Sequence, residues 1–559
     1  MTATTAASHD APTAAPAPEA QPDAPRPDFD AVVVGAGFAG MHQLHTLRGQ
    51  GLRVHAFEAG GDVGGTWYWN RYPGARVDIE SEHYSYSFDP ALEQEWDWSE
   101  RYSAQPELLA YASHVADRFD LRSDSTCDTR VSTLDWCEDD GLWTVSTDTG
   151  TEVTARFVVL ATGCLSVPKQ PEFPGTEDFT GEILYSANWP DDADLTGKDV
   201  AVIGTGSSGI QIITAIAAEV ASLTVYQRTP NFAIPAHNRD LTDDDRQRIK
   251  EDYTQIRAAD RSSRLGFTTG GGEPQEFGEL TPEQRRAALE ERWDYGGLGL
   301  TSTFSDTLLS RETNDAVAAF AHEQIRDRID DPEVAELLVP RSFPIGVKRL
   351  CVDTGYFEVY NAENVTLVDL NEHPIEAITA DGIRAGGEER SADVIVLATG
   401  FDAMTEAISR IDIRARGASL NQEWEGGART YLGLMTAGFP NLFLITGPQS
   451  PSVLTNMMTS IEYHVDYVAG IIRTMTERGQ DRVEARPEAQ DNWVATTDDL
   501  ADLTLFSEAA SWYRGANIPG KPRRFLPFPG GSDTYIAYCD AIALCGYHGF
   551  RFSPPVAGR

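Results

Sequence analysis

The sequence predicts an α/β protein with two interleaved Rossmann-like dinucleotide-binding domains and a helical insertion in the second domain. Two observations predict the domains, because a G-x-G-x-x-G motif follows a short apolar run near residue 35 and again near residue 204. A third observation predicts the insertion, since residues 236–339 are highly charged and are typical of amphipathic helices. A single glycine motif is weak evidence, but each of these lies between an apparent strand and an apparent helix.

The first motif follows the apolar run Ala31–Val34, which is typical of a buried parallel strand. Gly35 allows a tight turn, Gly37 lets a pyrophosphate approach the backbone, and Gly40 lets the next helix pack on the strand. The next strand ends at Glu58, roughly 20 residues after Gly37, where an acid accepts hydrogen bonds from ribose hydroxyls and repels a 2′-phosphate. This site is therefore predicted to bind FAD or NAD rather than NADP.

The second motif repeats this pattern with a different ending. Gly204, Gly206 and Gly209 follow the apolar run Asp199–Ile203. The next strand ends at Arg228 rather than at an acid, and a guanidinium there matches a 2′-phosphate bidentately. This site is predicted to prefer NADP(H). Two sites of opposite ribose chemistry indicate electron transfer between two cofactors, of which FAD and NADPH are the natural pair.

Composition excludes several classes of function. The chain of 559 residues has a net charge of −41, which disfavours nucleic acid and anionic membranes as partners. No apolar run approaches the roughly 18 residues that span a bilayer. Residues 1–28 lack the pattern of a secretory signal and are predicted to be a disordered tail. The six cysteines form no C-x-x-C pair, so we expect a cytoplasmic protein without a metal. A monomer or weak oligomer is expected, although no residue pattern indicates the oligomeric state.

The segment FTGEILYSANWP, between the two motifs, resembles the fingerprint F-x-G-x-x-x-H-x-x-x-W-P of type I Baeyer–Villiger monooxygenases. The matching residues are Phe179, Gly181, Trp189 and Pro190. Tyr185 stands where the family has histidine. A phenol keeps a ring and one hydrogen-bonding group but does not titrate near neutrality, so we expect a structural role for Tyr185.

The resemblance extends from Phe29 to Phe552 through GGTWYWNRYPGARVDIES, PIGVKRLCVDTGYFE and WYRGANIPGKPR, and it is closest to the steroid, cyclopentadecanone and phenylacetone branch. It implies that Arg349 is the catalytic arginine and that Asp78 holds it. The FAD residues assigned with the first motif and Glu58 are Gly65, Thr66, Trp67, Asp78, Tyr84, Val131 and Gln449. The NADP residues are Gly204, Thr205, Gly206, Ser207, Ser208, Gly209, Arg228, Thr229, Lys348 and Trp512. The implied substrate wall is Ser452, Val453 and Leu454.

The predicted domain boundaries follow the strand pattern. The FAD domain comprises 29–165 and 392–559, and the NADP domain comprises 166–235 and 340–391, with the insertion at 236–339. The boundary at 392 depends on Ala398-Thr399-Gly400, which repeats Ala161-Thr162-Gly163 and suggests that the chain has returned to the first domain.

The resemblance implies an FAD- and NADPH-dependent Baeyer–Villiger monooxygenase. In that reaction NADPH reduces FAD, O₂ adds to give a C4a-peroxyflavin, and the peroxide converts a ketone to an ester or lactone. A fixed guanidinium at Arg349 would stabilise the anionic peroxide and its adduct. We expect a hydrophobic cyclic or polycyclic ketone as substrate.

Three alternatives remain at this point. The first is a flavin monooxygenase that oxygenates nitrogen or sulfur. The second is a disulfide-type flavoprotein reductase, which needs a redox cysteine pair near the flavin, although no cysteine precedes Cys127. The third is a nucleotide-binding scaffold without turnover.

Overall fold

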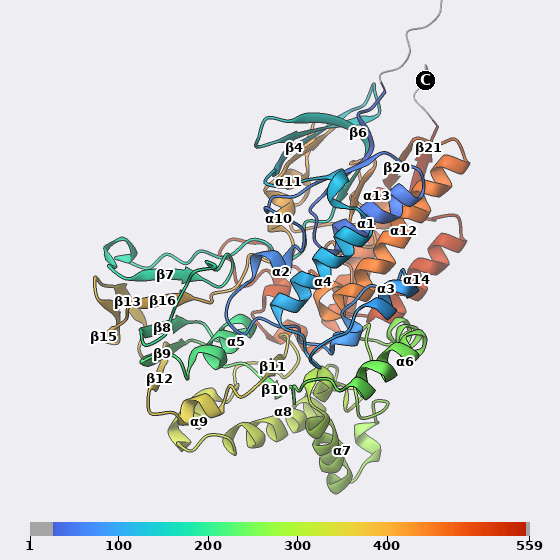
Figure 1. The fold of residues 1–559 in the computed structure, drawn as a ribbon. Helices are drawn as coiled ribbons and strands as arrows, with labels where there is room; N and C mark the ends of the chain where they lie inside the picture. Colours follow the sequence, from blue (N-terminus) through green and yellow to red (C-terminus); the bar gives the residue numbers. More distant parts are fainter. Residues whose placement is uncertain (1–25, 555–559) are drawn as a thin grey trace, which may run out of the picture.

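The computed structural model describes residues 26–554, and its strands form two main sheets in separate domains (Figure 1). Most of the predicted tail, residues 1–25, lies outside the described residues. Asp28, within that predicted tail, is anchored, because its carboxylate accepts a hydrogen bond of 2.8 Å from the backbone N–H of Thr154. Asp28 is therefore held against β6, although the predicted tail included it.

The first sheet has nine strands in the order β18-β17-β4-β5-β6-β1-β2-β3, with β19 also paired to β6. Its strands are β1 (Phe29–Val34), β2 (Val54–Phe57), β3 (Ser125–Thr126), β4 (Val131–Cys137), β5 (Leu142–Thr147), β6 (Glu152–Leu160), β17 (Asp412–Ala415), β18 (Ala418–Ser419) and β19 (Leu442–Leu444). The helices of this domain are α1 (Phe38–Gly49), α2 (Thr66–Trp69), α3 (Pro90–Glu95), α4 (Gln105–Arg118), α10 (Glu406–Ser409), α11 (Leu420–Glu423), α12 (Met457–Glu477), α13 (Pro487–Asp502) and α14 (Ser532–Leu544).

The second sheet is wholly parallel, in the order β12-β9-β8-β16-β7. Its strands are β7 (Glu182–Tyr185), β8 (Asp199–Ile203), β9 (Ser222–Gln227), β12 (Val365–Asp369) and β16 (Val394–Leu397), and α5 (Ser207–Ile216) packs on it. A small antiparallel sheet follows β12 and comprises β13 (Ile375–Ile378), β14 (Gly382–Ala385) and β15 (Glu388–Ser391). Two further strand pairs are β10 (Ala233–Pro235) with β11 (Cys351–Asp353), and β20 (Arg482–Ala485) with β21 (Phe550–Ser553).

The predicted boundary at residue 392 is wrong. Strand β16 pairs with β8 and β7, so it belongs to the second sheet. A Cβ on Gly35 would lie 2.6 Å from the carbonyl oxygen of Ala161, and one on Gly204 would lie 2.4 Å from that of Ala398. The two Ala-Thr-Gly segments therefore occupy equivalent positions beside the glycine motifs of the two domains. The chain returns to the first sheet only at β17, which pairs with β4.

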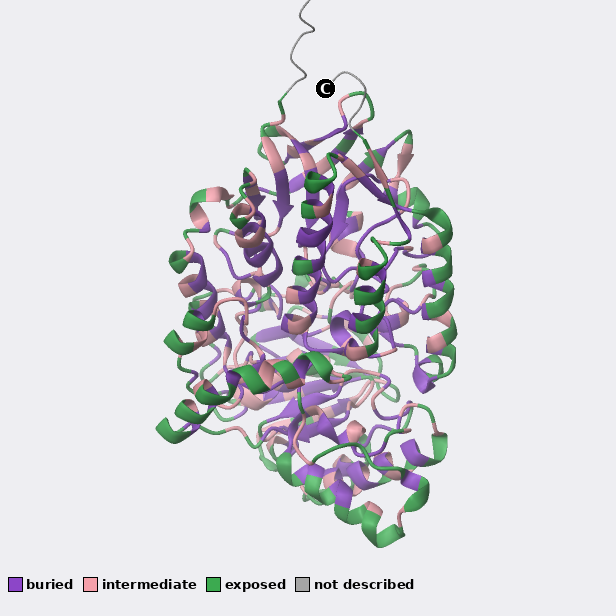
Figure 2. Cartoon of the chain, turned by 90° about the vertical axis from the view of Figure 1, so that its right-hand side faces the viewer, coloured by how far each residue is buried: buried purple, intermediate pink, exposed green. Residues whose placement is uncertain are grey.

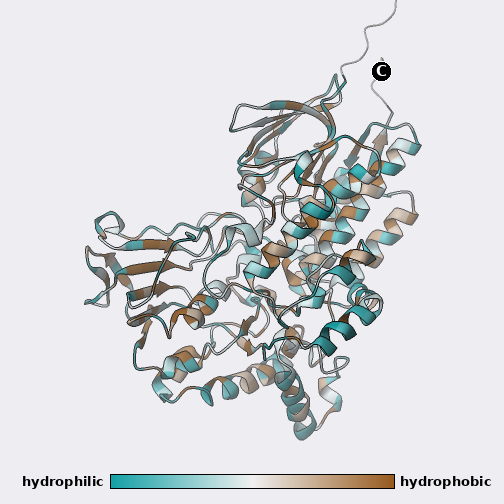
Figure 3. Ribbon diagram, in the orientation of Figure 1, coloured by the Kyte–Doolittle hydropathy of each residue, from teal (hydrophilic) through white to brown (hydrophobic). Residues whose placement is uncertain are grey.

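The insertion contains α6 (Asp243–Ser262), α7 (Pro282–Tyr295), α8 (Arg311–Arg326) and α9 (Pro332–Leu338), and it lies along the lower side of the molecule in Figure 1. Helix α6 begins where Thr242 and Asp245 form a reciprocal capping box. Figure 2 shows buried residues concentrated in the sheets and the inner helix faces, and Figure 3 shows hydrophilic residues on the outer faces of the insertion. Among residues 26–554, no helix combines the length and the apolar character needed to cross a membrane.

Candidate active site

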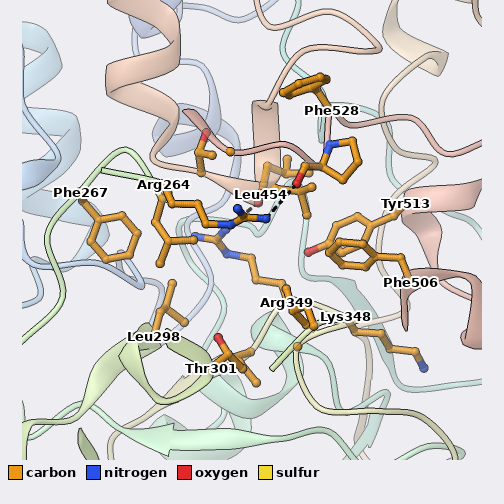
Figure 4. A pocket seen from close by; sticks show the side chains of 18 residues that line it. Arg264, Phe267, Leu298, Thr301, Lys348, Arg349, Leu454, Phe506, Tyr513 and Phe528 are labelled. Carbon is orange, nitrogen blue, oxygen red and sulfur yellow. Dashed lines mark hydrogen bonds between the residues drawn. The ribbon is translucent and has the colours of Figure 1, made fainter. Parts of the chain in front are cut away.

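A cavity of about 100 Å³ lies between the insertion and the C-terminal half of the chain (Figure 4). Its wall is mainly apolar and includes Phe267, Leu298, Leu454, Phe506 and Phe528. Three cationic residues also line it, namely Arg264, Lys348 and Arg349. A concave apolar site with a few polar groups is the usual form of a small-molecule site.

Arg349 and Asp78 form a bidentate ion pair at this wall. Nε of Arg349 lies 2.5 Å from Oδ2 of Asp78, and Nη2 lies 2.8 Å from Oδ1. Nη1 donates a hydrogen bond of 2.6 Å to the carbonyl of Val453. Burial lowers the pKa of Arg349, but the charge and hydrogen bonds of Asp78 raise it more, so the pKa lies above its ordinary value. The cavity therefore contains a permanent cation in a fixed orientation.

The loop that carries Asp78 connects the two domains. The hydroxyl of Tyr72 donates a hydrogen bond of 2.9 Å to the side-chain oxygen of Gln211 on α5, and the amide of Gln211 donates to the carbonyl of Arg76 at 3.2 Å. Arg349 lies just before β11. Its pairing with Asp78 therefore depends on how the two domains pack.

The first glycine motif has the features of a dinucleotide site. Helix α1 begins at Phe38 with no side-chain cap, so the N–H groups of its first turn are open to an anion. Glu58 is only 5% exposed and accepts hydrogen bonds from the N–H groups of Ala36 (2.6 Å) and Gly60 (2.7 Å). A carboxylate has lone pairs for further donors such as ribose hydroxyls. These residues fit the adenosine and phosphate parts of FAD.

Other residues assigned to FAD cluster beside this motif. A Cβ on Gly65 would lie 2.8 Å from the Cα of Gly37, so the backbone at Gly65 packs closely against the first glycine motif. Trp67 is buried, and its indole N–H donates to the hydroxyl of Tyr84 at 3.3 Å. Thr66 is exposed at the start of α2. Val131 is buried at the start of β4, in the same sheet.

The second glycine motif lies close to two cations. Arg228 is exposed at the end of β9, and Lys348 is half-buried with its Nζ 4.0 Å from the centre of the Phe343 ring. Burial and the charge of Arg228 both lower the pKa of Lys348. Among the described residues, neither cation has a carboxylate within 4.0 Å. Two unneutralised cations that repel each other fit a site for a phosphate.

The start of α5 completes this second site. Gly206 precedes the helix, and its first turn has no side-chain cap. Ser207 lies at its first position, and its hydroxyl is 3.4 Å from the sulfur of Cys351. The hydroxyl of Thr205 donates to the carbonyl of Thr229 at 3.0 Å, which ties the motif to the end of β9. Thr205, Gly206 and Ser207 therefore lie together at the N-terminus of α5.

Gln449, assigned to FAD, and Ser452, assigned to the substrate wall, are fully buried, and Trp512, assigned to NADP, is half-buried. The side chain of Gln449 bonds to the earlier segment 428–430, because its amide donates to the carbonyl of Ala428 and its oxygen accepts from Thr430. Ser452 is fully buried and does not line the cavity, whereas Val453 and Leu454 do. Trp512 is half-buried against Tyr513, and it is Tyr513 that lines the cavity.

Sequence reasoning missed Tyr513, Phe506 and Arg264 as lining residues. Only Tyr513 had a usable signal, because it adjoins the tryptophan that the resemblance singled out. Phe506 and Arg264 lie in segments with no motif.

The fingerprint segment is a structural connection. Phe179 and Tyr185 pack against the buried face of the second sheet, and Trp189 is buried against the other face. The N–H of Asn188 donates to the carbonyl of Trp69 in the first domain at 3.0 Å. The ring of Tyr185 takes part in this packing, and the structural role expected for it stays a prediction.

Comparison with known proteins identifies close relatives. A family model described as pyridine nucleotide-disulphide oxidoreductase matches residues 32–264. A Baeyer–Villiger monooxygenase from Pseudooceanicola batsensis is 42% identical over 526 residues, which cover 93% of this chain and 95% of the relative. The solved structure of an oxidized steroid monooxygenase bound to NADP is 49% identical, with a TM-score of 0.91, and the match covers 94% of this chain and 100% of that one. The structure of OTEMO in complex with FAD and NADP is 38% identical, with a TM-score of 0.90, over 94% of this chain and 100% of that chain.

Proposed function

The chain belongs to the type I Baeyer–Villiger monooxygenases, and from this premise we propose that the cavity beside Arg349 is the site where a ketone is oxygenated. The protein is an FAD- and NADPH-dependent enzyme that inserts one oxygen atom of O₂ next to a ketone carbonyl, which gives an ester or lactone. When bound, FAD and NADPH supply the reducing electrons and the activation of O₂. The chain's own residues bind, orient and shield the reactants.

The ion pair of Arg349 and Asp78 carries this proposal. Oxygen insertion places negative charge on the carbonyl oxygen of the ketone as the new bond forms. A guanidinium that is already oriented stabilises that charge without reorganisation, and the apolar wall strengthens the effect by excluding water. Asp78 acts as a positioning residue, because it fixes the plane of the guanidinium.

We assign the cofactors to the two glycine motifs by their ribose chemistry. Glu58 and the start of α1 support FAD in the first domain, which we take as 29–165 with the segment from 401 onward. Arg228, Lys348 and the start of α5 support NADP in the second domain, comprising 166–235 and 340–400. The insertion at 236–339 then forms one side of the substrate cavity.

We propose a hydrophobic cyclic or polycyclic ketone as substrate. The lining of large apolar side chains supports this class, as does the similarity to a steroid monooxygenase. The six cysteines all lie in the described part of the chain and are free, which supports the reducing cytoplasm as its location. The monomeric or weakly oligomeric state remains a prediction.

Product analysis tests the proposed function. The purified enzyme is incubated with NADPH, O₂ and cyclic ketones of increasing size, and products are identified by gas chromatography with mass spectrometry. Lactone that forms in proportion to NADPH consumed supports the proposal. Oxidation of a thioether or an amine without any lactone would refute it in favour of the nitrogen- or sulfur-oxygenating alternative.

A further inference from the structure

We propose that Arg264 is a specificity-determining residue of this cavity, which binds a carboxylate carried by the ketone substrate in addition to its reacting carbonyl. This inference rests on the proposed function, because it takes the cavity as the substrate site. It narrows the substrate class from hydrophobic ketones to hydrophobic keto acids.

Arg264 is held in place by its backbone. It follows the end of α6, and its carbonyl accepts a hydrogen bond of 2.8 Å from the N–H of Ser532. The next carbonyl, that of Leu265, accepts one of 2.7 Å from Asn456. A Cβ on Gly531 would lie 2.8 Å from Cγ of Arg264, so the glycine makes room for the side chain. Figure 4 shows the side chain extending into the cavity.

The guanidinium of Arg264 forms no ion pair within the described part of the chain. Among residues 26–554, no carboxylate oxygen lies within 4.0 Å of its guanidinium, and Asp533, beyond Gly531, forms no ion pair with it. Its one polar contact is a long one, from Nη2 to the carbonyl of Pro529 at 3.4 Å. A guanidinium has five N–H donors, so most of them remain available.

The other two cations of the cavity are assigned to other partners, Arg349 to Asp78 and Lys348 to the phosphate of NADP. Arg349 is paired bidentately with Asp78. Lys348 lies over the Phe343 ring, and Figure 4 shows its amine pointing away from the centre of the cavity. Arg264 is therefore the cavity cation that is free to bind an anionic group of a substrate.

A carboxylate fits this arrangement best. The planar fork of a guanidinium matches the two oxygens of a carboxylate, and the apolar wall accepts the hydrocarbon part of the same molecule. The net charge of −41 repels anions at long range, but this repulsion is screened beyond about 8 Å at physiological ionic strength. Recognition therefore depends on the local contact.

A matched pair of substrates tests the inference. The value of kcat/KM is measured for (4-oxocyclohexyl)acetate and for its methyl ester, with the wild type, Arg264→Met and Arg264→Lys. Because the methyl ester has no charge, the ratio of kcat/KM for the acid to kcat/KM for the ester measures the contact between Arg264 and the carboxylate. We expect Arg264→Met to lower this ratio about tenfold, while Arg264→Lys retains part of it. Raising the ionic strength should lower the ratio in the wild type but not in Arg264→Met.

Arg261→Met is the matched control. Arg261 is also an exposed arginine near the end of α6, but its guanidinium lies over the Tyr463 ring and does not line the cavity. The variant Arg261→Met should leave the acid-to-ester ratio of kcat/KM unchanged. An unchanged ratio in Arg264→Met, or equal losses for acid and ester, would overturn the inference.

A binding measurement separates this inference from the proposed function. Calorimetric titration with cyclohexylacetate, which has no ketone, should show about tenfold weaker binding to Arg264→Met than to the wild type. Equal affinity, or no affinity in either protein, would overturn the role of Arg264. If the wild type converts none of the cyclic ketones in the product analysis, the proposed function fails, while the titration still decides whether Arg264 binds a carboxylate.

Discussion

The choice of nucleotide is predicted to depend on Arg228 and Lys348, and Arg228→Ala is the sharpest perturbation of it. Arg228 is exposed and has no acidic partner within 4.0 Å in the described chain, so its removal breaks no internal ion pair. A hydrogen bond to a charged group contributes about 1.5–3 kcal/mol, and for an exposed residue we take the lower end. This corresponds to a KM for NADPH about tenfold higher, with little change for NADH, which has no 2′-phosphate.

Arg228→Ala is also predicted to change the pH dependence of the KM for NADPH. Because the charge of Arg228 helps to lower the pKa of Lys348, removing it should raise that pKa toward its ordinary value. Lys348 then stays protonated to higher pH, and the alkaline rise in KM for NADPH moves upward. Lys198→Ala is the control, because Lys198 precedes the first residue of β8, whereas the glycine motif follows the last residue of that strand. Steady-state kinetics with both nucleotides at several pH values measure these effects. Equal losses with NADPH and NADH would refute the nucleotide assignment.

Three further predictions concern positioning, stability and the fingerprint. Asp78→Asn should lower kcat for ester formation about 10- to 100-fold, because Arg349 loses its charged partner. An unchanged kcat with a higher KM for NADPH would contradict a positioning role for Asp78. His83 lies 2.9 Å from Asp260 in a buried ion pair, and although burial lowers its pKa, Asp260 raises it more, so the net pKa is raised. The contribution of this pair to the free energy of unfolding is therefore complete below the pKa of His83 in the unfolded chain, about 6.5, and is lost as pH rises through its pKa in the folded chain. His83→Gln should flatten this pH dependence of the melting temperature. Tyr185→His should change the ratio of product to NADPH consumed by less than about threefold, since the ring acts by packing; a large gain in coupling would show that titration at this position matters.

Local patterns predicted much of the fold. Strand β8 has the predicted bounds, because an apolar run between polar turns fixes a buried parallel strand. Glu58 and Arg228 lie at the strand ends where ribose chemistry requires them. These features depend on residues within one βαβ unit, which a sequence displays directly.

Features that depend on contacts between residues far apart in the sequence could not be predicted from local patterns. The repeat at Ala398 has the same local sequence in both domains, so it could not show which sheet β16 joins. Asp78 and Arg349 are 271 positions apart, and only the family resemblance indicated their pairing. The sequence does not show whether the amide of Gln449 faces a ligand or bonds to Ala428 and Thr430, as it does in the structure. Arg264 has no motif, and its lack of an acidic partner is visible only in three dimensions.

The central claim is that Arg349 supports oxygen insertion at this cavity, and isotope labelling tests it most directly. Wild type and Arg349→Met are supplied with NADPH, a cyclic ketone and ¹⁸O₂, and the lactone is analysed by mass spectrometry. We predict one labelled oxygen in the lactone from the wild type, and no lactone from Arg349→Met while NADPH is still consumed. Labelled lactone from Arg349→Met at the wild-type yield would contradict the claim.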